Sequence, residues 1–188
     1  MSKVEILKKY IQSLDGYKIS DTHFQIGAKI HSSNFYYAKR LFQNSYYTAR
    51  IAMLLAIKIK VTLMDKKQAL TIVGYEMYSE LLLSLIRNFL NEFGYLNINH
   101  YVTTDIDGEI KYLPNNVVFH DKIVIVVPIT STGSTINKIS ENIKKKRPET
   151  LKENITPFTV LQSYDPDDNF TNLIKQQNTL ITLETKWQ

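Results

Sequence analysis

The sequence has no cysteine, which excludes disulfides, thiol nucleophiles and thiolate metal sites. It has no apolar run long enough to span a bilayer. Its first stretch, "MSKVEILKKYIQSL", mixes charged and apolar residues and lacks the uninterrupted apolar core of a secretion signal, so it predicts an amphipathic helix. Internal repeats, low-complexity tracts and interdomain linkers are also missing. We therefore expect a cytoplasmic protein with no membrane partner.

What is present is typical of a globular protein. The 188 residues are 44% hydrophobic and 22% charged, which fits one domain spanning residues 1–188 around one core. The net charge of +5 permits an anionic ligand. The dense basic run Lys144–Arg147 precedes Pro148, so it is either the solvated last turn of a helix or a nucleic-acid patch. No aromatic stacking motif accompanies the run, and a nucleic-acid partner is therefore not expected.

The order of the apolar segments predicts an α/β fold. "ALTIVGY" is a short apolar strand followed by the apolar helix "SELLLSLIRNFLNEFG", which is half of a parallel crossover unit. "KIVIVVPI" is a β-branched run typical of a parallel strand covered on both faces. We expect a central parallel sheet flanked by helices. The other expected elements are a helix over 4–14, a helix from Asn44 or Ser45 with Ala49, Met53, Ala56 and Ile57 on one face, a hairpin around Asp107-Gly108, the helix "TINKISENIKKK", the strands "TPFTVLQSY" and "TLITLETKW", and a helix in "NFTNLIKQQ".

A loop of small residues follows the buried strand and precedes a helix. Amides at a helix start are unpaired, the helix dipole favours negative charge, and a glycine lets the backbone approach a ligand. The loop therefore either binds a terminal phosphate or is a polar turn whose hydroxyls cap the helix. Its residues are Thr130, Ser131, Thr132, Gly133, Ser134 and Thr135.

Three blocks together resemble type I phosphoribosyltransferases, and the orotate phosphoribosyltransferases in particular. "IVIVVPITSTGST" is similar to the strand and 5′-phosphate loop that bind phosphoribosyl pyrophosphate. "KIHSSNFYYAKRLFQN" looks like the amino-terminal segment of the orotate branch, with His31, Ser32, Phe35, Tyr36, Leu41 and Phe42 at its motif positions. "IVGYEMYSELLLSLI" stands where the family has its pyrophosphate loop, here Gly74, Tyr75, Glu76, Met77, Tyr78 and Ser79.

The resemblance implies a small hood built partly from about residues 18–43, a base-binding side at His31, Phe35 and Tyr36, and a homodimer. The residues alone leave other roles open. His31 is either a contact to a substrate base or a turn residue that bonds within its own loop. The Tyr36-Tyr37 and Tyr46-Tyr47 pairs are more typical of packing or dimer contacts than of base stacking.

The chain departs from the family pattern at three places. The acidic pair that binds the ribose diol falls on Val127 and Pro128, whose side chains accept no hydrogen bond. The basic residue of the pyrophosphate loop aligns near Tyr78. Thr103 and Thr104 stand where the mobile catalytic loop has basic residues, with only His100 and Lys111 nearby. Because pyrophosphate departure develops negative charge, these losses argue against ordinary catalysis.

Two functions remain. The protein is either an orotate phosphoribosyltransferase-like transferase that uses magnesium, or a non-catalytic relative that binds a nucleotide or phosphosugar as a sensor or as a module of a larger system. Its ligand is then phosphoribosyl pyrophosphate, a nucleotide or another phosphorylated small molecule. No catalytic residue is assigned.

No metal site is predicted from the residues. The stretches "SYDPDDNF" and "TTDIDGEI" have the composition of turns. The alternative is that their carboxylates provide oxygen ligands for a hard cation. The four histidines, His23, His31, His100 and His120, lack metal-ligand spacing.

Overall fold

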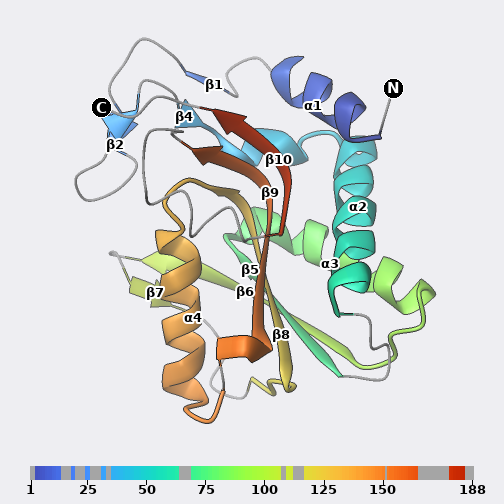
Figure 1. Cartoon of the computed structure of the whole chain (residues 1–188), viewed down its shortest axis with the longest axis vertical. Helices are drawn as coiled ribbons and strands as arrows, with labels where there is room; N and C mark the ends of the chain where they lie inside the picture. The colour runs from blue at the N-terminus through green and yellow to red at the C-terminus, as the bar shows by residue number, and fades with distance from the viewer. Residues whose placement is uncertain are drawn as a thin grey trace.

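The computed structural model describes residues 3–13, 18–19, 24–25, 31–32, 35–63, 69–106, 109–111, 117–150, 152–164 and 178–184. Its centre is a six-stranded sheet in the order β10-β9-β8-β5-β6-β7. The first five of these strands are parallel, and β7 pairs antiparallel with the edge strand β6. The parallel sheet flanked by helices confirms the fold predicted from the sequence (Figure 1).

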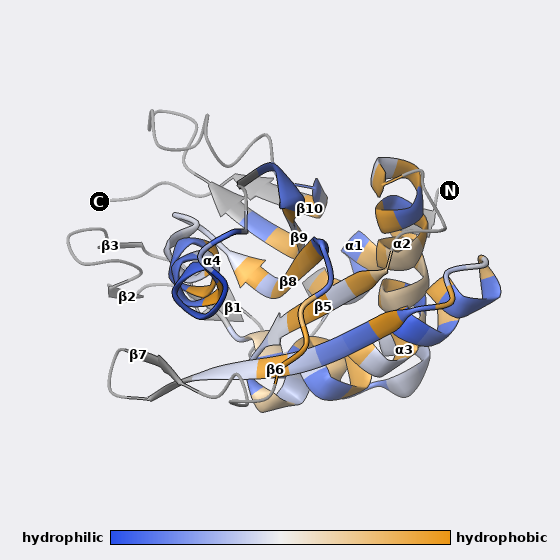
Figure 2. Ribbon diagram, turned by 90° about the horizontal axis from the view of Figure 1, so that it is seen from below, coloured by the Kyte–Doolittle hydropathy of each residue, from blue (hydrophilic) through white to orange (hydrophobic). Residues whose placement is uncertain are grey.

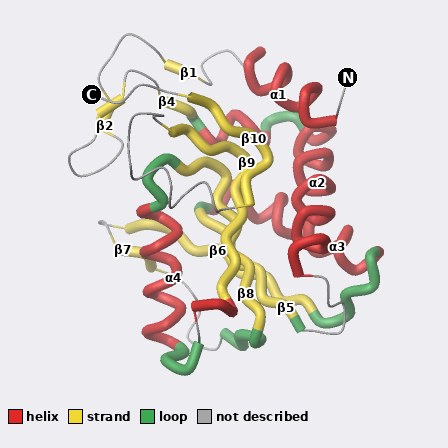
Figure 3. Tube along the Cα trace, viewed as in Figure 1, coloured by secondary structure: helices red, strands yellow, loops and turns green. Residues whose placement is uncertain are grey.

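The central strands are β5 (Leu70–Tyr75), β6 (Ile98–Ile106), β7 (Glu109–Lys111), β8 (Lys122–Thr130), β9 (Ile155–Tyr164) and β10 (Asn178–Glu184). The helices are α1 (Lys3–Ser13), α2 (Ser45–Leu63), α3 (Glu80–Glu92) and α4 (Ser134–Lys146), with the 3₁₀ turns η1 (Ala38–Phe42), η2 (Met77–Ser79) and η3 (Lys152–Asn154). Two strand–helix–strand units, β5–α3–β6 and β8–α4–β9, follow one another along the chain, as the sequence predicted (Figure 3). The helix expected in "NFTNLIKQQ" lies outside the described residues.

Two apolar layers cover the sheet. On one face, buried residues of α1, α2 and α3 pack against β5, β8, β9 and β10. On the other face, Ile136, Ile139 and Ile143 of α4 pack against Val73 and the alternate residues of β8. Because β8 lies between these layers, it is buried along most of its length, which explains its continuous run of β-branched residues. The outer side of α4 is hydrophilic (Figure 2).

Helix α2 begins where the sequence predicted but buries a different face. The side-chain Oδ1 of Asn44 accepts hydrogen bonds from the amides of Tyr46 (3.0 Å) and Tyr47 (3.3 Å), so Asn44 caps the helix. Of the expected face of Ala49, Met53, Ala56 and Ile57, Ala56 is buried, but Met53 is exposed and its assignment to the buried face is wrong. The buried residues are Thr48, Ile51, Ala52, Leu55, Ala56 and Ile59.

Around the edges of the sheet, the hairpin of β6 and β7 is confirmed, with Ile106 paired to Glu109. Helix α4 ends within the basic run, as predicted. There Arg147 forms ion pairs with Asp121 and Glu149, both at 2.9 Å. In the described part of the chain, no helix combines the length and apolarity needed to cross a bilayer.

The amino-terminal segment forms two small antiparallel sheets. Strands β1 (Lys18–Ile19) and β4 (Phe35–Tyr36) pair with each other, and so do β2 (Phe24–Gln25) and β3 (His31–Ser32). In Figure 1, β1, β2 and β4 lie beyond the edge at which β9 and β10 end. This is the carboxyl edge of the central sheet. The segment expected to form a hood therefore lies at the edge where the strand-to-helix loops emerge.

Candidate functional site

The strand order sets β5 and β8 side by side at the centre of the sheet, and the space outside the carboxyl ends of these two strands is named the crevice. The chain leaves β5 through α3 to reach β6 on one side, and it leaves β8 through α4 to reach β9 on the other. The two connections run in opposite directions from neighbouring strands, which defines a topological switch point. Ligands of open parallel sheets bind outside the carboxyl ends of the strands at such a point. The loops that follow β5 and β8, residues 74–79 and 130–135, thus border the same crevice.

The loop after β8 leads directly into α4 (Figure 3). Gly133 is the residue before the helix, and its φ of 77° and ψ of 4° lie in the left-handed region that glycine enters without strain. The amide of Asn137 donates the first helical hydrogen bond to the carbonyl of Gly133, at 3.0 Å. Gly133, as the N-cap residue, provides no side-chain cap, and the Ser134 amide donates a long hydrogen bond of 3.4 Å to Thr132 Oγ1. A loop hydroxyl thus contacts the first helical amide, and both interpretations of the loop, a phosphate site and a capped turn, stay open.

The end of β8 carries no polar side chain where the resemblance implies acids. Val127 is 1% exposed and packs in the apolar layer beneath α4. Pro128 is also buried. A carboxylate in place of Val127 would enter this apolar layer and lose its hydration. Val127 thus has a structural role in the core, and the strand end offers a ligand no side-chain hydrogen bond at these two positions.

The loop after β5 is held tightly by its own backbone. A Cβ added to Gly74 would lie 2.6 Å from Leu83 Cδ1, so α3 packs against the strand at a distance that leaves little space for a side chain. Ser79 Oγ lies 2.7 Å from the carbonyl of Tyr75 and 2.5 Å from that of Glu76, and the Ser79 amide donates to the latter carbonyl at 2.9 Å. Ser79 therefore closes the turn.

Glu76 has an unusual backbone conformation within this loop. Its φ of 68° and ψ of 147° are rare for any residue with a side chain. Its amide donates to the carbonyl of Thr103 at 2.7 Å, which ties the loop to the neighbouring strand β6. Its carboxylate makes no hydrogen bond or ion pair with the residues that the structure describes. The sequence placed Glu76 in the loop but gave it no role of its own, because a glutamate does not predict a positive φ.

Tyr78 stands where the resemblance implies a basic residue. Its ring stacks on Phe42 of η1 with 6.0 Å between the ring centres, which brings the amino-terminal block against the loop after β5. Burial raises the pKa of the Tyr78 hydroxyl, and the nearby Glu76, Tyr75 and Tyr37 raise it further. The phenol is therefore neutral at physiological pH. It offers a hydrogen bond but no positive charge for a pyrophosphate.

The residues expected near the catalytic loop lie in β6 and β7. Thr103 is fully buried, and Thr104 pairs in register with Lys111 within the hairpin. His100 Nε2 lies 2.8 Å from Glu80 Oε1, so this histidine pairs with the first turn of α3. The described part of the segment "HYVTTDIDGEIKYL" thus belongs to β6 and β7, while its residues 107–108 and 112–113 lie outside the described part.

Other sequence candidates have different outcomes. The backbones of His31, Phe35 and Tyr36 lie in β3 and β4, and their side chains fall outside the described atoms. The stretch 165–168 also lies outside the described residues. Tyr47 stacks on Tyr10 of α1 with ring centres 3.6 Å apart, which confirms a packing role.

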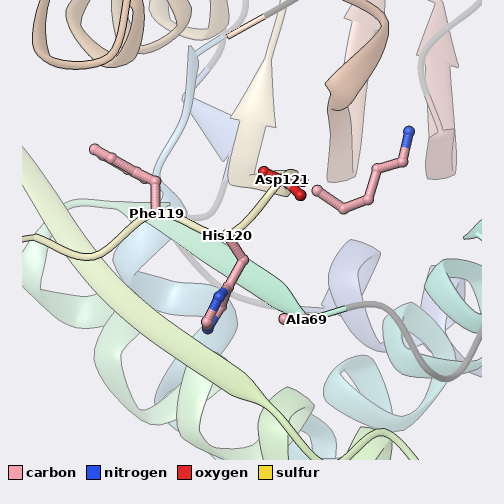
Figure 4. Close-up of a pocket in the computed structure, with 5 residues that line it drawn as sticks. Ala69, Phe119, His120 and Asp121 are labelled. Carbon is pink, nitrogen blue, oxygen red and sulfur yellow. The ribbon is translucent and has the colours of Figure 1, made fainter. Parts of the chain in front are cut away.

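A separate pocket of about 240 Å³ opens at the opposite edge of the sheet. The residues that line it lie just before β5 or at the start of β8. In Figure 4, the side chains of Phe119 and His120 point in different directions. Asp121 is paired with Arg147, and the His120 amide donates to Thr71 Oγ1 at 2.8 Å. The Asp121 carboxylate and the His120 amide thus form contacts that fix the ends of the strands. The lining residues are Ala69, Phe119, His120, Asp121 and Lys122.

Magnesium, which the resemblance implies for an active enzyme, requires oxygen ligands and usually binds through one or two carboxylates and substrate phosphates. Among the described residues, no three or more His, Cys, Asp or Glu side chains are grouped to hold a metal ion. Val127 and Pro128 provide no oxygen ligand through their side chains. The residues at the end of β8 therefore do not fit a magnesium site.

Comparison with known proteins gives matches in structure alone. No family model matches the chain, and no curated protein matches it. The orotate phosphoribosyltransferase of Mycobacterium tuberculosis H37Rv in complex with Fe(III) dicitrate matches with a TM-score of 0.58 and 10% identity, covering 97% of both chains. The same enzyme in complex with inorganic phosphate gives 0.54 and 10% over 96% of both chains. A mutant of the hypoxanthine phosphoribosyltransferase of Trypanosoma cruzi, complexed with the product IMP, gives 0.50 and 11% over 74% of each chain.

These similarities identify the architecture. The five parallel strands and their flanking helices form a type I phosphoribosyltransferase-like fold, as predicted from the three sequence blocks. At identities of 10–11%, the likeness concerns the fold alone.

Proposed function

We propose that this protein binds a phosphorylated ribose or a nucleotide through residues 130–135, and that it does not catalyse ordinary phosphoribosyl transfer. The observation that carries the proposal is the start of α4 at the switch point, where the N-cap residue Gly133 provides no side-chain cap, beside a strand end without acids at Val127 and Pro128. Such a binding protein acts as a sensor or as a module of a larger system. An orotate phosphoribosyltransferase-like transferase that uses magnesium is the alternative.

The phosphate side of the proposal rests on backbone chemistry. The amides of the first turn of this 13-residue helix point out of its amino-terminal end, where the helix dipole favours an anion. The left-handed Gly133 turns the chain into the helix without a side chain that would obstruct an approaching phosphate. One structural neighbour, the orotate phosphoribosyltransferase of M. tuberculosis, forms a complex with inorganic phosphate, which is consistent with this ligand class.

Local charge disfavours phosphoribosyl transfer. The transition state places negative charge on a departing pyrophosphate, and cations or a metal must stabilise it. At the loop after β5, Tyr78 is a neutral phenol and Glu76 is an acid, so the local charge has the wrong sign. On β6, Thr103 is buried and His100 is paired with Glu80. The described residues around the crevice therefore supply hydrogen-bond donors for a phosphate. They do not supply the cationic groups that a departing pyrophosphate requires.

One experiment separates binding from catalysis. The protein is incubated with phosphoribosyl pyrophosphate, magnesium and a panel of purine and pyrimidine bases, and released pyrophosphate is measured. We expect no release above the background of a sample without protein. Pyrophosphate release that depends on one of the bases would establish the transferase alternative.

A thermal-shift screen of ribose 5-phosphate, nucleoside monophosphates and inorganic phosphate tests the binding itself. A ligand at one hundred times its Kd adds about 2.7 kcal/mol of stability, which raises the Tm of a protein of this size by roughly 5–10 °C. Gly133→Asp places a charge and a side chain in the loop and should abolish the shift. Gly94→Asp is the matched control, because Gly94 also has a positive φ, of 96°, but lies at the far end of α3.

A ligand shift that is unchanged in Gly133→Asp would remove the 130–135 loop from the proposal. A screen in which no phosphate compound stabilises the protein would remove the phosphate ligand altogether.

We also propose that two copies pair through α2. This helix carries apolar residues all round, although such a helix is usually buried on every side. Tyr46 is 58% exposed, Met53 37% and Val61 61%. The spacing of 3.6 residues per turn places them on one stripe with Arg50 and Ile57. A second copy that covers this stripe would bury these side chains and give the homodimer that the resemblance implies.

A further inference from the structure

The carboxylate of Glu76 is the charged group of the crevice that has no structural role in the described part of the chain. The backbone of this residue is fixed, with its amide bonded to Thr103 and its carbonyl bonded by Ser79. The side chain is partly exposed and makes no hydrogen bond or ion pair among the described residues. A carboxylate needed only for solubility could stand anywhere on the surface. This one is held in a conformation that costs about 1–3 kcal/mol for a residue with a side chain.

Strand register places Glu76 and the position of a missing acid beyond the same end of one ladder. The ladder between β5 and β8 pairs Leu70 with Lys122 and ends at the pair of Gly74 with Val126. Glu76 and Pro128 each lie two residues beyond that last pair. Neighbouring strands are about 4.8 Å apart, so the two chains leave the ladder from adjacent positions. A carboxylate that cannot come from the end of β8 is therefore available from the end of β5.

The chemistry of a carboxylate limits what it can recognise here. An ionised carboxylate accepts hydrogen bonds at two oxygens and donates none, so it suits a ligand with neighbouring hydroxyls and repels a second phosphate. The phosphate loop begins at Thr130, two residues beyond Pro128, so one small ligand can reach both groups. A sugar phosphate carries the two required features, a terminal phosphate and adjacent hydroxyls, on one compact molecule.

We propose that Glu76 binds the vicinal hydroxyls of a ribose whose 5′-phosphate occupies the 130–135 loop, and that it excludes ligands with a pyrophosphate at this position. This assignment rests on the proposed phosphate-binding function and narrows its ligand to ribose 5-phosphate or a nucleoside 5′-monophosphate. Glu76 is then a specificity-determining residue. It supplies from β5 the acceptor that β8 lacks, and its negative charge opposes a diphosphate in the loop after β5.

The test compares two sugars that differ by a single hydroxyl. Binding of ribose 5-phosphate, 2-deoxyribose 5-phosphate, inorganic phosphate and inorganic pyrophosphate is measured by calorimetry in the presence of EDTA, which prevents any contribution from a bound metal. The proteins are the unaltered chain, Glu76→Gln, Glu76→Ala and the control Glu92→Gln. Glu92 is exposed at the end of α3, so its substitution removes the same charge away from the crevice.

We expect the unaltered chain and Glu92→Gln to prefer ribose 5-phosphate over its deoxy analogue by about tenfold or more, as is typical for one hydrogen bond to a charged group. In Glu76→Ala the ratio should fall to about one, and in both Glu76 variants pyrophosphate should bind more tightly because a like charge is gone. Inorganic phosphate should still bind in all four proteins. Melting curves without ligand establish that each variant is folded.

Two results would overturn the assignment. Equal binding of the two sugars by the unaltered chain, or a preference that survives in Glu76→Ala, removes Glu76 from ribose recognition and leaves the phosphate loop standing. Failure of every phosphate compound to bind removes the proposed function, and the assignment falls with it.

Discussion

Replacing Glu76 by glycine should stabilise the protein, although the same change at an ordinary position destabilises it. The φ of 68° and ψ of 147° lie in a region that costs a residue with a side chain about 1–3 kcal/mol. Glycine enters this region freely, but its greater freedom in the unfolded chain costs about 0.4–1 kcal/mol. The difference is a gain of about 1 kcal/mol, which corresponds to a rise in Tm of roughly 2–4 °C for a chain of this length.

Comparing the stability of Glu76→Gly with that of Glu76→Ala separates the effect of backbone strain from the effect of the carboxylate. Alanine also removes the carboxylate but retains Cβ, so it keeps the strain, and we expect Glu76→Gly to be the more stable of the two. Urea unfolding of both variants measures the difference in free energy. Ala49→Gly, within α2, is the reference for an ordinary site and should lose about 1 kcal/mol. If alanine at position 76 is more stable than glycine, as at the reference site, the loop carries no strain and the reasoning is refuted.

Three further outcomes are expected. Gly74→Ala should lower the free energy of unfolding by about 1–3 kcal/mol, because its Cβ would lie 2.6 Å from Leu83 Cδ1 and force the side chain to move; an unchanged urea midpoint would contradict this packing. Tyr78 has a raised pKa, so above its ordinary value of 10.0 the unfolded chain releases a proton that the folded chain retains. Stability should therefore fall as pH rises above that value, and Tyr78→Phe should lessen the fall between about pH 9 and about pH 11; identical losses in both proteins would contradict the assignment. Light scattering should show a dimer that Met53→Glu dissociates and Leu96→Glu, at an exposed site on the loop after α3, leaves intact; a monomeric unaltered chain would end the pairing proposal.

The sequence predicted the elements whose pattern has one physical explanation. A strand covered on both faces must be apolar throughout, and "KIVIVVPI" is β8. An Asp-Gly pair between alternating segments fits a hairpin, and β6 pairs with β7 on either side of it. The apolar helix that ends before Gly94 is α3, and the glycine has the positive φ expected after a helix.

The features that the sequence did not predict also have physical explanations. Helix α2 is apolar on every side, so hydrophobic periodicity could not distinguish its buried face from the exposed stripe that contains Met53. The conformation of Glu76 depends on hydrogen bonds to Thr103 and from Ser79, which join residues that only the folded chain brings together. That Glu76 and Pro128 follow the same end of one ladder depends on the strand order, and strand order cannot be deduced from the order of the elements in the sequence.

The proposed phosphate loop and the positions that depart from the family pattern differ in how they are built. The proposed loop consists of backbone amides at a helix start and a glycine that turns the chain, so it tolerates changes in the surrounding side chains. Recognition of a diol or of a pyrophosphate depends on particular side chains, and Val127, Pro128 and Tyr78 differ there from the family pattern. On the proposal made above, such a fold would keep a phosphorylated ligand without the transfer chemistry. A single carboxylate in the loop after β5, that of Glu76, would then determine which phosphorylated sugar the site prefers.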